Sequence, residues 1–151
     1  MRFNGYRACF MPQCVRAHPL EAVQVSEPHR ILIADDYPDT AETTADLLRL
    51  DGYEVFTAFN GQQAVQAANE QHPEVIILDI NMPVMDGYQA AAELRLHPPS
   101  GPRPVLVAHT ARATPADVKQ AMDSGFDHHV GKPGWPRLGD LLRSLFKERV
   151  R

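Results

Sequence analysis

Five short apolar segments, each followed by a helical pattern, constrain the fold of this chain more than any other sequence feature. The apolar segments are predicted strands, and they cover residues 30–34, 53–58, 74–78, 104–108 and 127–130. Helices are predicted after them at residues 38–50, 61–71, 87–96, 114–124 and 136–147. Strands that alternate with helices in this way form a parallel sheet with helices on both faces. The pattern therefore predicts an α/β fold.

Local signals set the boundaries of the first helix. Pro38 suits the first turn of a helix, where its missing N–H costs nothing. Leu47, Leu48 and Leu50 are expected on the inner side of this helix, and Gly52 is expected to follow its end.

Length and composition limit the class of protein. The 151 residues suit one domain with a modest tail, and 44% hydrophobic with 23% charged residues is ordinary globular usage. The net charge of -4 at pH 7 argues against direct nucleic-acid binding, and the basic residues near the C-terminus are interpreted as a solvated face. The sequence has no run of 18 apolar residues, so no membrane partner is expected.

The first part of the chain differs from the rest. Residues 1–28 show no clean period and contain three prolines, which predicts a flexible N-terminal extension before a domain at 29–151. Cys9, Cys14 and His18 have a spacing that could hold a metal, but three ligands fall short of the four of a structural zinc site. The absence of cysteine elsewhere fits a reducing, cytoplasmic location.

Polar side chains follow four of the five predicted strands. Asp35 and Asp36 follow the first strand, Asp79 the third, Thr110 the fourth and Lys132 the fifth. The carboxyl ends of parallel strands share one edge of the sheet, where open α/β sheets bind ligands. Three close carboxylates repel one another, and a hard cation such as Mg²⁺, which prefers oxygen ligands, relieves that repulsion. The sequence therefore predicts a Mg²⁺ site, with Asp79 as a nucleophile that forms an aspartyl phosphate.

Each of these residues also has an ordinary explanation when it is taken alone. An Asp after a strand often caps a turn, a Lys before Pro is usually solvated, and a Thr often bonds locally. Their joint presence on different strands favours chemistry, because Mg²⁺, the Thr110 hydroxyl and the Lys132 ammonium can each hold one phosphoryl oxygen.

The segment from Asp79 to Gly87, with the sequence DINMPVMDG, resembles the phosphorylation loop of response-regulator receiver domains. Further motifs of that family match at the expected strand ends, namely Asp35-Asp36, Thr110-Ala111 and Gly131-Lys132-Pro133. The resemblance covers about residues 30–148. It implies a flavodoxin-like, doubly wound sheet of five strands in the order 2-1-3-4-5 with five helices, similar to the chemotaxis regulators.

The resemblance also implies a role for each site residue. Asp79 would accept the phosphoryl group, and Asp36 and Asp79 would ligate Mg²⁺ through their side chains. Asn81 would add its backbone carbonyl, and Asp35 would act on the metal through water. Lys132 would pair with the phosphoryl group, and its peptide bond to the following proline is expected to be cis.

Two histidines and one tryptophan depart from the common pattern of the family. Thr110 and His129 would form the switch, but His129 stands where the family usually has Tyr or Phe. Because imidazole is small, polar and titratable near neutrality, the switch would be weakened or pH-dependent. The alternative is that His129 is simply half-exposed on the fifth strand. His109 is interpreted as a satisfied local side chain, and Trp135 is expected to pack near the loop that follows Lys132.

The resemblance implies a signalling switch that catalyses only its own phosphorylation and dephosphorylation, rather than an enzyme. The phosphate would come from a histidine kinase or a histidine phosphotransfer protein. Because the sequence ends soon after the last helix, we expect the output to be binding of a downstream protein, by a single-domain regulator, a phosphate shuttle or one piece of a longer hybrid system. The sequence carries no signal for the oligomeric state, so a dimer remains open.

Three alternatives compete with this prediction. A pseudo-receiver would bind proteins without taking phosphate, although all the key residues are present. A phosphatase of the haloacid dehalogenase type would need an Asp-x-Asp pattern, and the second position here is Asn81. A flavodoxin-like cofactor carrier is disfavoured because the carboxylates would repel a flavin phosphate.

Overall fold

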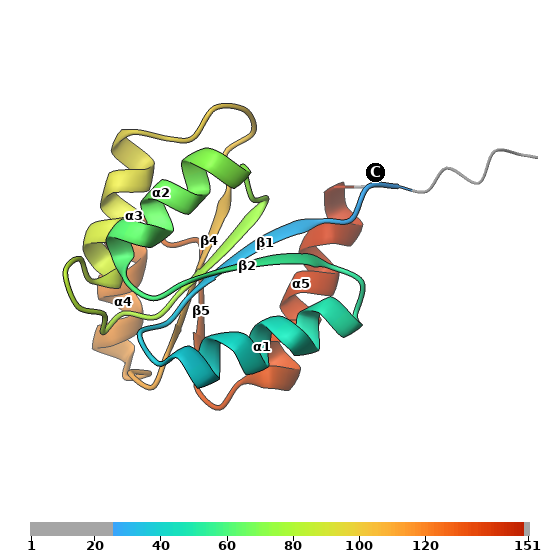
Figure 1. Cartoon of the computed structure of the whole chain (residues 1–151). Helices are drawn as coiled ribbons and strands as arrows, with labels where there is room; N and C mark the ends of the chain where they lie inside the picture. The colour runs from blue at the N-terminus through green and yellow to red at the C-terminus, as the bar shows by residue number, and fades with distance from the viewer. Residues whose placement is uncertain (1–25, 150–151) are drawn as a thin grey trace, which may run out of the picture.

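The computed structural model describes residues 26–149, which form a five-stranded parallel sheet between two layers of helices (Figure 1). The strands are β1 (Arg30–Ala34), β2 (Glu54–Ala58), β3 (Val75–Leu78), β4 (Val105–Thr110) and β5 (His128–Gly131). The helices are α1 (Pro38–Leu50), α2 (Gly61–Gln71), α3 (Gly87–Leu96), α4 (Pro115–Asp123) and α5 (Trp135–Arg149). The strand order β2-β1-β3-β4-β5 confirms the predicted topology.

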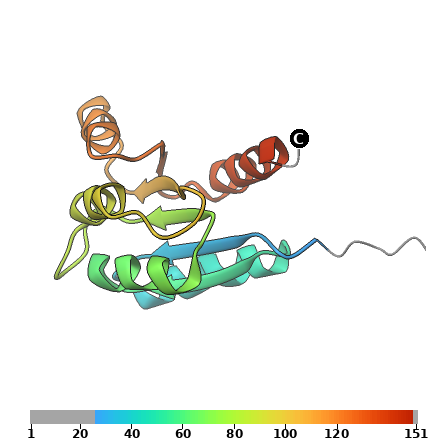
Figure 2. The same cartoon turned by 90° about the horizontal axis from the view of Figure 1, so that it is seen from above.

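Helices cover both faces of the sheet, as Figures 1 and 2 show. On one face, α2, α3 and α4 pack over a core that includes Leu32 and Ile76. On the other face, α1 and α5 pack over a core that includes Ile31 and Ile77. Successive residues of a strand point to opposite faces, so a strand that is covered on both sides must be apolar throughout. This explains why all four residues of β3 are buried.

Side chains at the helix starts satisfy backbone N–H groups that have no partner within the helix. The side chain of Asn60 caps α2 by accepting from the Gln63 N–H. Asp86 and Gln89 form a reciprocal capping box at α3, and Thr114 and Asp117 form another at α4. These caps fix where each helix begins relative to the strand before it.

The inner side of α1 differs from the prediction. Leu48 is fully buried, but Leu47 is 38% and Leu50 is 83% exposed. Ala41 and Ala45 complete the buried stripe with Leu48, at the three- and four-residue spacing of one helix face. Leu47 and Leu50 fall outside that stripe, so the prediction for these two residues was wrong.

The fourth strand is longer than predicted. It continues past Ala108 through His109 and Thr110, because both residues stay paired with β5. The apolar run ends at Ala108, so the sequence pattern did not include the two polar residues that follow.

The predicted N-terminal extension lies almost wholly outside the described residues, and so do Cys9, Cys14 and His18. Within residues 26–149, the helices are too short or too polar to cross a membrane.

Candidate functional site

The first part of the site is built by the two central strands. β1 and β3 are neighbours, and Ala34 pairs with Leu78, so the residues that follow these two strands emerge side by side. The backbone N–H of Asp79 donates to the carbonyl oxygen of Ala34 over 2.8 Å, which extends the ladder to the phosphoacceptor candidate. The backbone N–H of Asp35 donates to the carbonyl oxygen of Ala58 on β2 over 3.1 Å.

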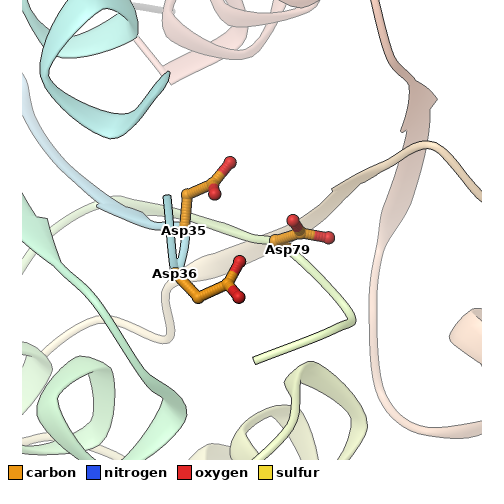
Figure 3. Close-up of side chains that lie close together, drawn as sticks. All are labelled: Asp35, Asp36 and Asp79. Atoms are coloured by element: carbon orange, nitrogen blue, oxygen red, sulfur yellow. The ribbon is translucent and has the colours of Figure 1, made fainter. Parts of the chain in front are cut away.

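Three carboxylates gather at this point. Asp35, Asp36 and Asp79 each place a carboxylate oxygen within 4.8 Å of the others, and Figure 3 shows the three side chains together at the ends of β1 and β3. Asp35 is only 4% exposed, whereas Asp36 is exposed and Asp79 is half-buried. The cluster therefore opens to solvent on the side of Asp36.

Lys132 places its ammonium between two of these carboxylates. Its Nζ donates to Asp35 Oδ2 over 2.5 Å and to Asp79 Oδ2 over 3.0 Å. Burial lowers the pKa of the ammonium, but the hydrogen bonds to Asp35 and Asp79 and their negative charges outweigh it, so the pKa of Lys132 is raised. The Lys132–Pro133 peptide bond is cis, as predicted from the resemblance.

The loop after β3 holds Asp79 from the other side. The Ile80 N–H donates to Asp79 Oδ1 over 2.7 Å, and the Gly87 N–H donates to the Ile80 carbonyl over 2.8 Å. A Cβ atom on Gly87 would collide with the backbone oxygen of Asp79, so only glycine permits this approach of α3. Met82, in the same loop, is buried and packs into the core under α2, α3 and α4.

Thr110 ends β4 at the same edge of the sheet and is 1% exposed. Its hydroxyl oxygen accepts from the Arg112 N–H over 3.3 Å, so the hydroxyl contacts the segment between β4 and α4 rather than the carboxylates. The Lys132 N–H donates to the Thr110 carbonyl over 2.9 Å, which ties β5 to β4 beside the cluster.

His129 lies away from the carboxylates. Its Nε2 is 2.8 Å from the carbonyl oxygen of Arg112. A carbonyl oxygen only accepts, so Nε2 must carry the proton. Asn81 is exposed in the loop two residues after Asp79. The structure therefore brings together Lys132 and the three carboxylates, and it places Thr110 and His129 around Arg112.

His109 is the residue for which the sequence interpretation was wrong. The side chain is 9% exposed, and its Nε2 is buried without a hydrogen-bond partner among residues 26–149. Burial and the positive charge of Lys132 lower the pKa of His109 to about 4, although the negative charges of Asp35 and Asp79 oppose this shift. His109 is therefore neutral at pH 7 and is not a satisfied side chain.

The donor set fits a hard divalent cation. All the candidate ligands at the cluster are carboxylate oxygens, and the mixed burial leaves room for bound water on the side of Asp36. Lys132 already neutralises part of the charge, so a cation has to share Asp35 and Asp79 with the ammonium.

The chain belongs to the response-regulator receiver family, because residues 31–143 match the family described as "Response regulator receiver domain". It is 38% identical over 104 residues to the transcriptional regulatory protein PrrA of Mycobacterium tuberculosis, an alignment that covers 69% of this chain and 43% of PrrA. It is 30% identical over 131 residues to the sensor histidine kinase RcsC of Escherichia coli, which covers 87% of this chain and 14% of RcsC. The chain thus spans less than half the length of these relatives.

Solved structures agree on the fold. A putative response regulator from Chloroflexus aurantiacus superposes with a TM-score of 0.71 at 29% identity, over 83% of this chain and all of that one. The chemotaxis protein CheY4 of Vibrio cholerae superposes with a TM-score of 0.69 at 27% identity, over 77% of this chain and 98% of that one.

Two sets of contacts at the site, those of Lys132 and those of Arg112, were missed by the sequence analysis. Lys132 was assigned to the phosphoryl group, whereas the structure pairs it with Asp35 as well as with Asp79. The contacts of Arg112 with Thr110 and His129 were also missed. The charge balance of three carboxylates against one lysine could have indicated the first contact, but no sequence signal indicates the second.

Proposed function

We propose that Asp79 accepts a phosphoryl group from a phosphohistidine of a histidine kinase or a histidine phosphotransfer protein. The observation that carries this proposal is the position of Lys132, whose ammonium contacts Asp79 inside a cluster of three carboxylates. Membership of the receiver family supports it, because receivers act as signalling switches.

The chemical step is a transfer between two acceptors. A carboxylate oxygen of Asp79 attacks phosphorus in line, the phosphorus–nitrogen bond to the donor imidazole breaks, and an acyl phosphate forms. The leaving imidazole takes the electron pair and a proton. Lys132 is placed to hold one phosphoryl oxygen, because its ammonium already contacts the carboxylate that reacts.

Asp36 and Asp79 would hold Mg²⁺ through their side chains, Asn81 through its backbone carbonyl and Asp35 through water. Bound at this place, the cation would neutralise charge on the carboxylates and on the transferred group. Asp35 keeps one oxygen for Lys132, and its Oδ1 accepts from the Tyr37 N–H over 2.9 Å, so its position is set without a metal. Asp36 is exposed and makes the open side of the site.

Thr110 and His129 would carry the signal. A Thr110 hydroxyl that turns toward the phosphoryl group shifts the oxygen to which the Arg112 N–H donates, and His129 is attached to the carbonyl of the same residue. Phosphorylation would thereby change the segment between β4 and α4 and the surface beside β5, where a downstream protein would bind.

The role of His129 can be tested by replacement with the residue type usual in the family. In a His129→Tyr variant, the phosphorylated protein should bind its downstream partner with a different affinity and a different pH profile. If both stay unchanged, His129 is only a half-exposed residue of β5.

The experiment that tests the function is the intact mass of the protein after incubation with Mg²⁺ and acetyl phosphate. We expect a gain of about 80 Da, one phosphoryl group, that is absent in Asp79→Asn and absent when EDTA replaces Mg²⁺. Asp86→Asn is the matched control, because Asp86 lies in the same loop but caps α3, a task that asparagine also performs.

Each outcome decides between the two candidate functions. A gain of mass that Asp86→Asn keeps and Asp79→Asn loses supports a phosphoryl-accepting receiver. No gain, under conditions that modify a known receiver, would point to a pseudo-receiver that acts by protein binding alone.

A further inference from the structure

Tyr88, in the first turn of α3, carries a hydroxyl that does not stabilise the fold. The residue is partly buried and packs against the core that lies under α2, α3 and α4. Its hydroxyl is buried, yet it has no hydrogen-bond partner among residues 26–149. A phenylalanine would fill the same space without this penalty, because a buried hydroxyl that loses water without gaining a partner destabilises the state that contains it.

Two of the three charged groups that act on this hydroxyl, Arg112 and Asp117, belong to the segment that the phosphorylated switch would move, and the third, Asp86, caps α3. Burial raises the pKa of Tyr88, and the negative charge of Asp117 raises it further, while the positive charge of Arg112 opposes this. Arg112 lies between β4 and α4, and Asp117 lies in the first turn of α4. Figures 1 and 2 both place α4 next to α3 on the same face of the sheet.

Asp117 has an oxygen that is free to accept a hydrogen bond. Its Oδ2 accepts from the Thr114 hydroxyl over 2.6 Å and from the Thr114 N–H over 3.2 Å. Its Oδ1 accepts no hydrogen bond from the described part of the chain. An ionised carboxylate is a strong acceptor for a phenolic hydroxyl.

The segment between β4 and α4, which leads to Asp117, lies on the surface. Residues 111–114 are all exposed, and one of their ties to the site is the long hydrogen bond of 3.3 Å from the Arg112 N–H to the Thr110 hydroxyl. A movement of Thr110 toward Asp79 would displace this acceptor and, with it, the start of α4.

We infer that Tyr88 is a positioning residue of the switch, whose hydroxyl is unpaired in the unphosphorylated arrangement and donates to Asp117 in the phosphorylated one. The inference rests on the proposed function of Asp79. It follows that Tyr88 destabilises the resting state relative to the phosphorylated state and so makes the phosphoryl group more effective as a signal.

The test uses the full chain with Mg²⁺ and beryllofluoride, a stable mimic of an aspartyl phosphoryl group. For Tyr88→Phe, the unfolding midpoint without beryllofluoride should rise by about 3 °C. Its apparent Kd for beryllofluoride, measured by titration, should be about tenfold weaker, which corresponds to about 1.4 kcal/mol. In the Tyr88→Phe background, Asp117→Asn should change this Kd no further. Tyr53→Phe, which removes a hydroxyl near α5, is the control and should leave the Kd unchanged.

The outcomes are distinct. A lower midpoint in Tyr88→Phe would show that the hydroxyl has a partner in the resting state and would overturn the inference. A higher midpoint with an unchanged Kd would overturn it as well, because the hydroxyl would then be unpaired in both states. If the unaltered protein and Asp79→Asn respond to beryllofluoride alike, the proposed function itself fails, and the inference falls with it.

Discussion

Lys132 and Asp35 are 97 residues apart in the chain, and their side chains meet at 2.5 Å. The same ammonium reaches Asp79 at 3.0 Å, so one lysine neutralises part of a cluster that contains three carboxylates. A divalent cation that binds this cluster competes with the lysine for the same oxygens.

Lys132→Met should therefore change Mg²⁺ binding and phosphoryl transfer in opposite directions. We expect Mg²⁺ to bind about threefold to tenfold more tightly, because the competing ammonium is gone, while modification by acetyl phosphate slows. Titration with Mg²⁺ followed by the fluorescence of Trp135, the only tryptophan in the chain, measures the first effect. Lys119→Met, at an exposed ion pair with Asp123, should change neither. Weaker Mg²⁺ binding in Lys132→Met would contradict this account.

His109 should make the fold sensitive to acid. Its pKa falls from an ordinary value of about 6.5 in the unfolded chain to about 4 in the folded one. Above pH 6.5 both states are neutral at this residue. As the pH drops from about 6.5 to about 4, only the unfolded chain takes up the proton, so the free energy of unfolding falls by about 3 kcal/mol over this window and then levels off.

The measurement is urea unfolding of the unaltered protein and of His109→Leu from pH 7.5 to pH 4. Leucine removes both the titrating group and the unpaired Nε2, so the loss of stability over this window should shrink. His97→Leu, at a side chain that is 75% exposed, should keep the full acid sensitivity. Parallel pH profiles for the unaltered protein and His109→Leu would refute the prediction.

Arg95 should be among the most important charged residues for stability. From the end of α3, its guanidinium donates to the carbonyls of Gly125 and Pro104 over 2.9 Å and to the Asp127 carboxylate over 2.6 Å. Arg95→Met keeps the aliphatic stem but leaves these acceptors without their donor, which should cost about 2–4 kcal/mol.

Chemical denaturation of Arg95→Met measures this loss directly. Arg143→Met is the control, because Arg143 pairs with Asp140 three residues away on the exposed surface of α5. Equal effects of the two substitutions would mean that the Arg95 contacts do not hold α3 to the loops around it.

Val84 should be a site where a substitution stabilises the protein. It has a φ of 68°, in the left-handed region that β-branched residues avoid, and its side chain is 78% exposed, so little packing is lost when it changes. Val84→Asn should raise the free energy of unfolding by about 1 kcal/mol, since asparagine tolerates this conformation. Val84→Ala removes the β-branch but lacks the local side-chain hydrogen bond that lets asparagine tolerate this conformation, so it should recover less. A loss of stability in Val84→Asn would show that the valine makes a compensating contact.

The fold was predictable because the apolar runs are short, frequent and separated by residues that stop helices. The end of β4 was not predictable, because His109 and Thr110 do not continue the apolar pattern of a buried strand. Only their pairing with Val130 and Gly131 on β5 extends the strand. A local sequence pattern cannot include a pairing partner that lies 21 residues further along the chain.

The residues of the candidate site could be predicted from the sequence, because the carboxyl ends of parallel strands lie at the same edge of the sheet. Their contacts could not be predicted in the same way. Whether Lys132 reaches Asp35, or whether the hydroxyl of Tyr88 finds a partner, depends on side-chain conformations and on helix positions. These are set by packing across the whole domain rather than by local sequence.

The carboxylates and Lys132 are held by different parts of the sheet. Asp35 and Asp79 continue β1 and β3, which are buried in the middle of the sheet, whereas Lys132 follows β5 at its edge. Edge strands open more readily than central ones. A transient loosening of β5 would withdraw the ammonium while the acidic cluster keeps its shape, so the proposed response to phosphate would be lost while the proposed cation site would remain.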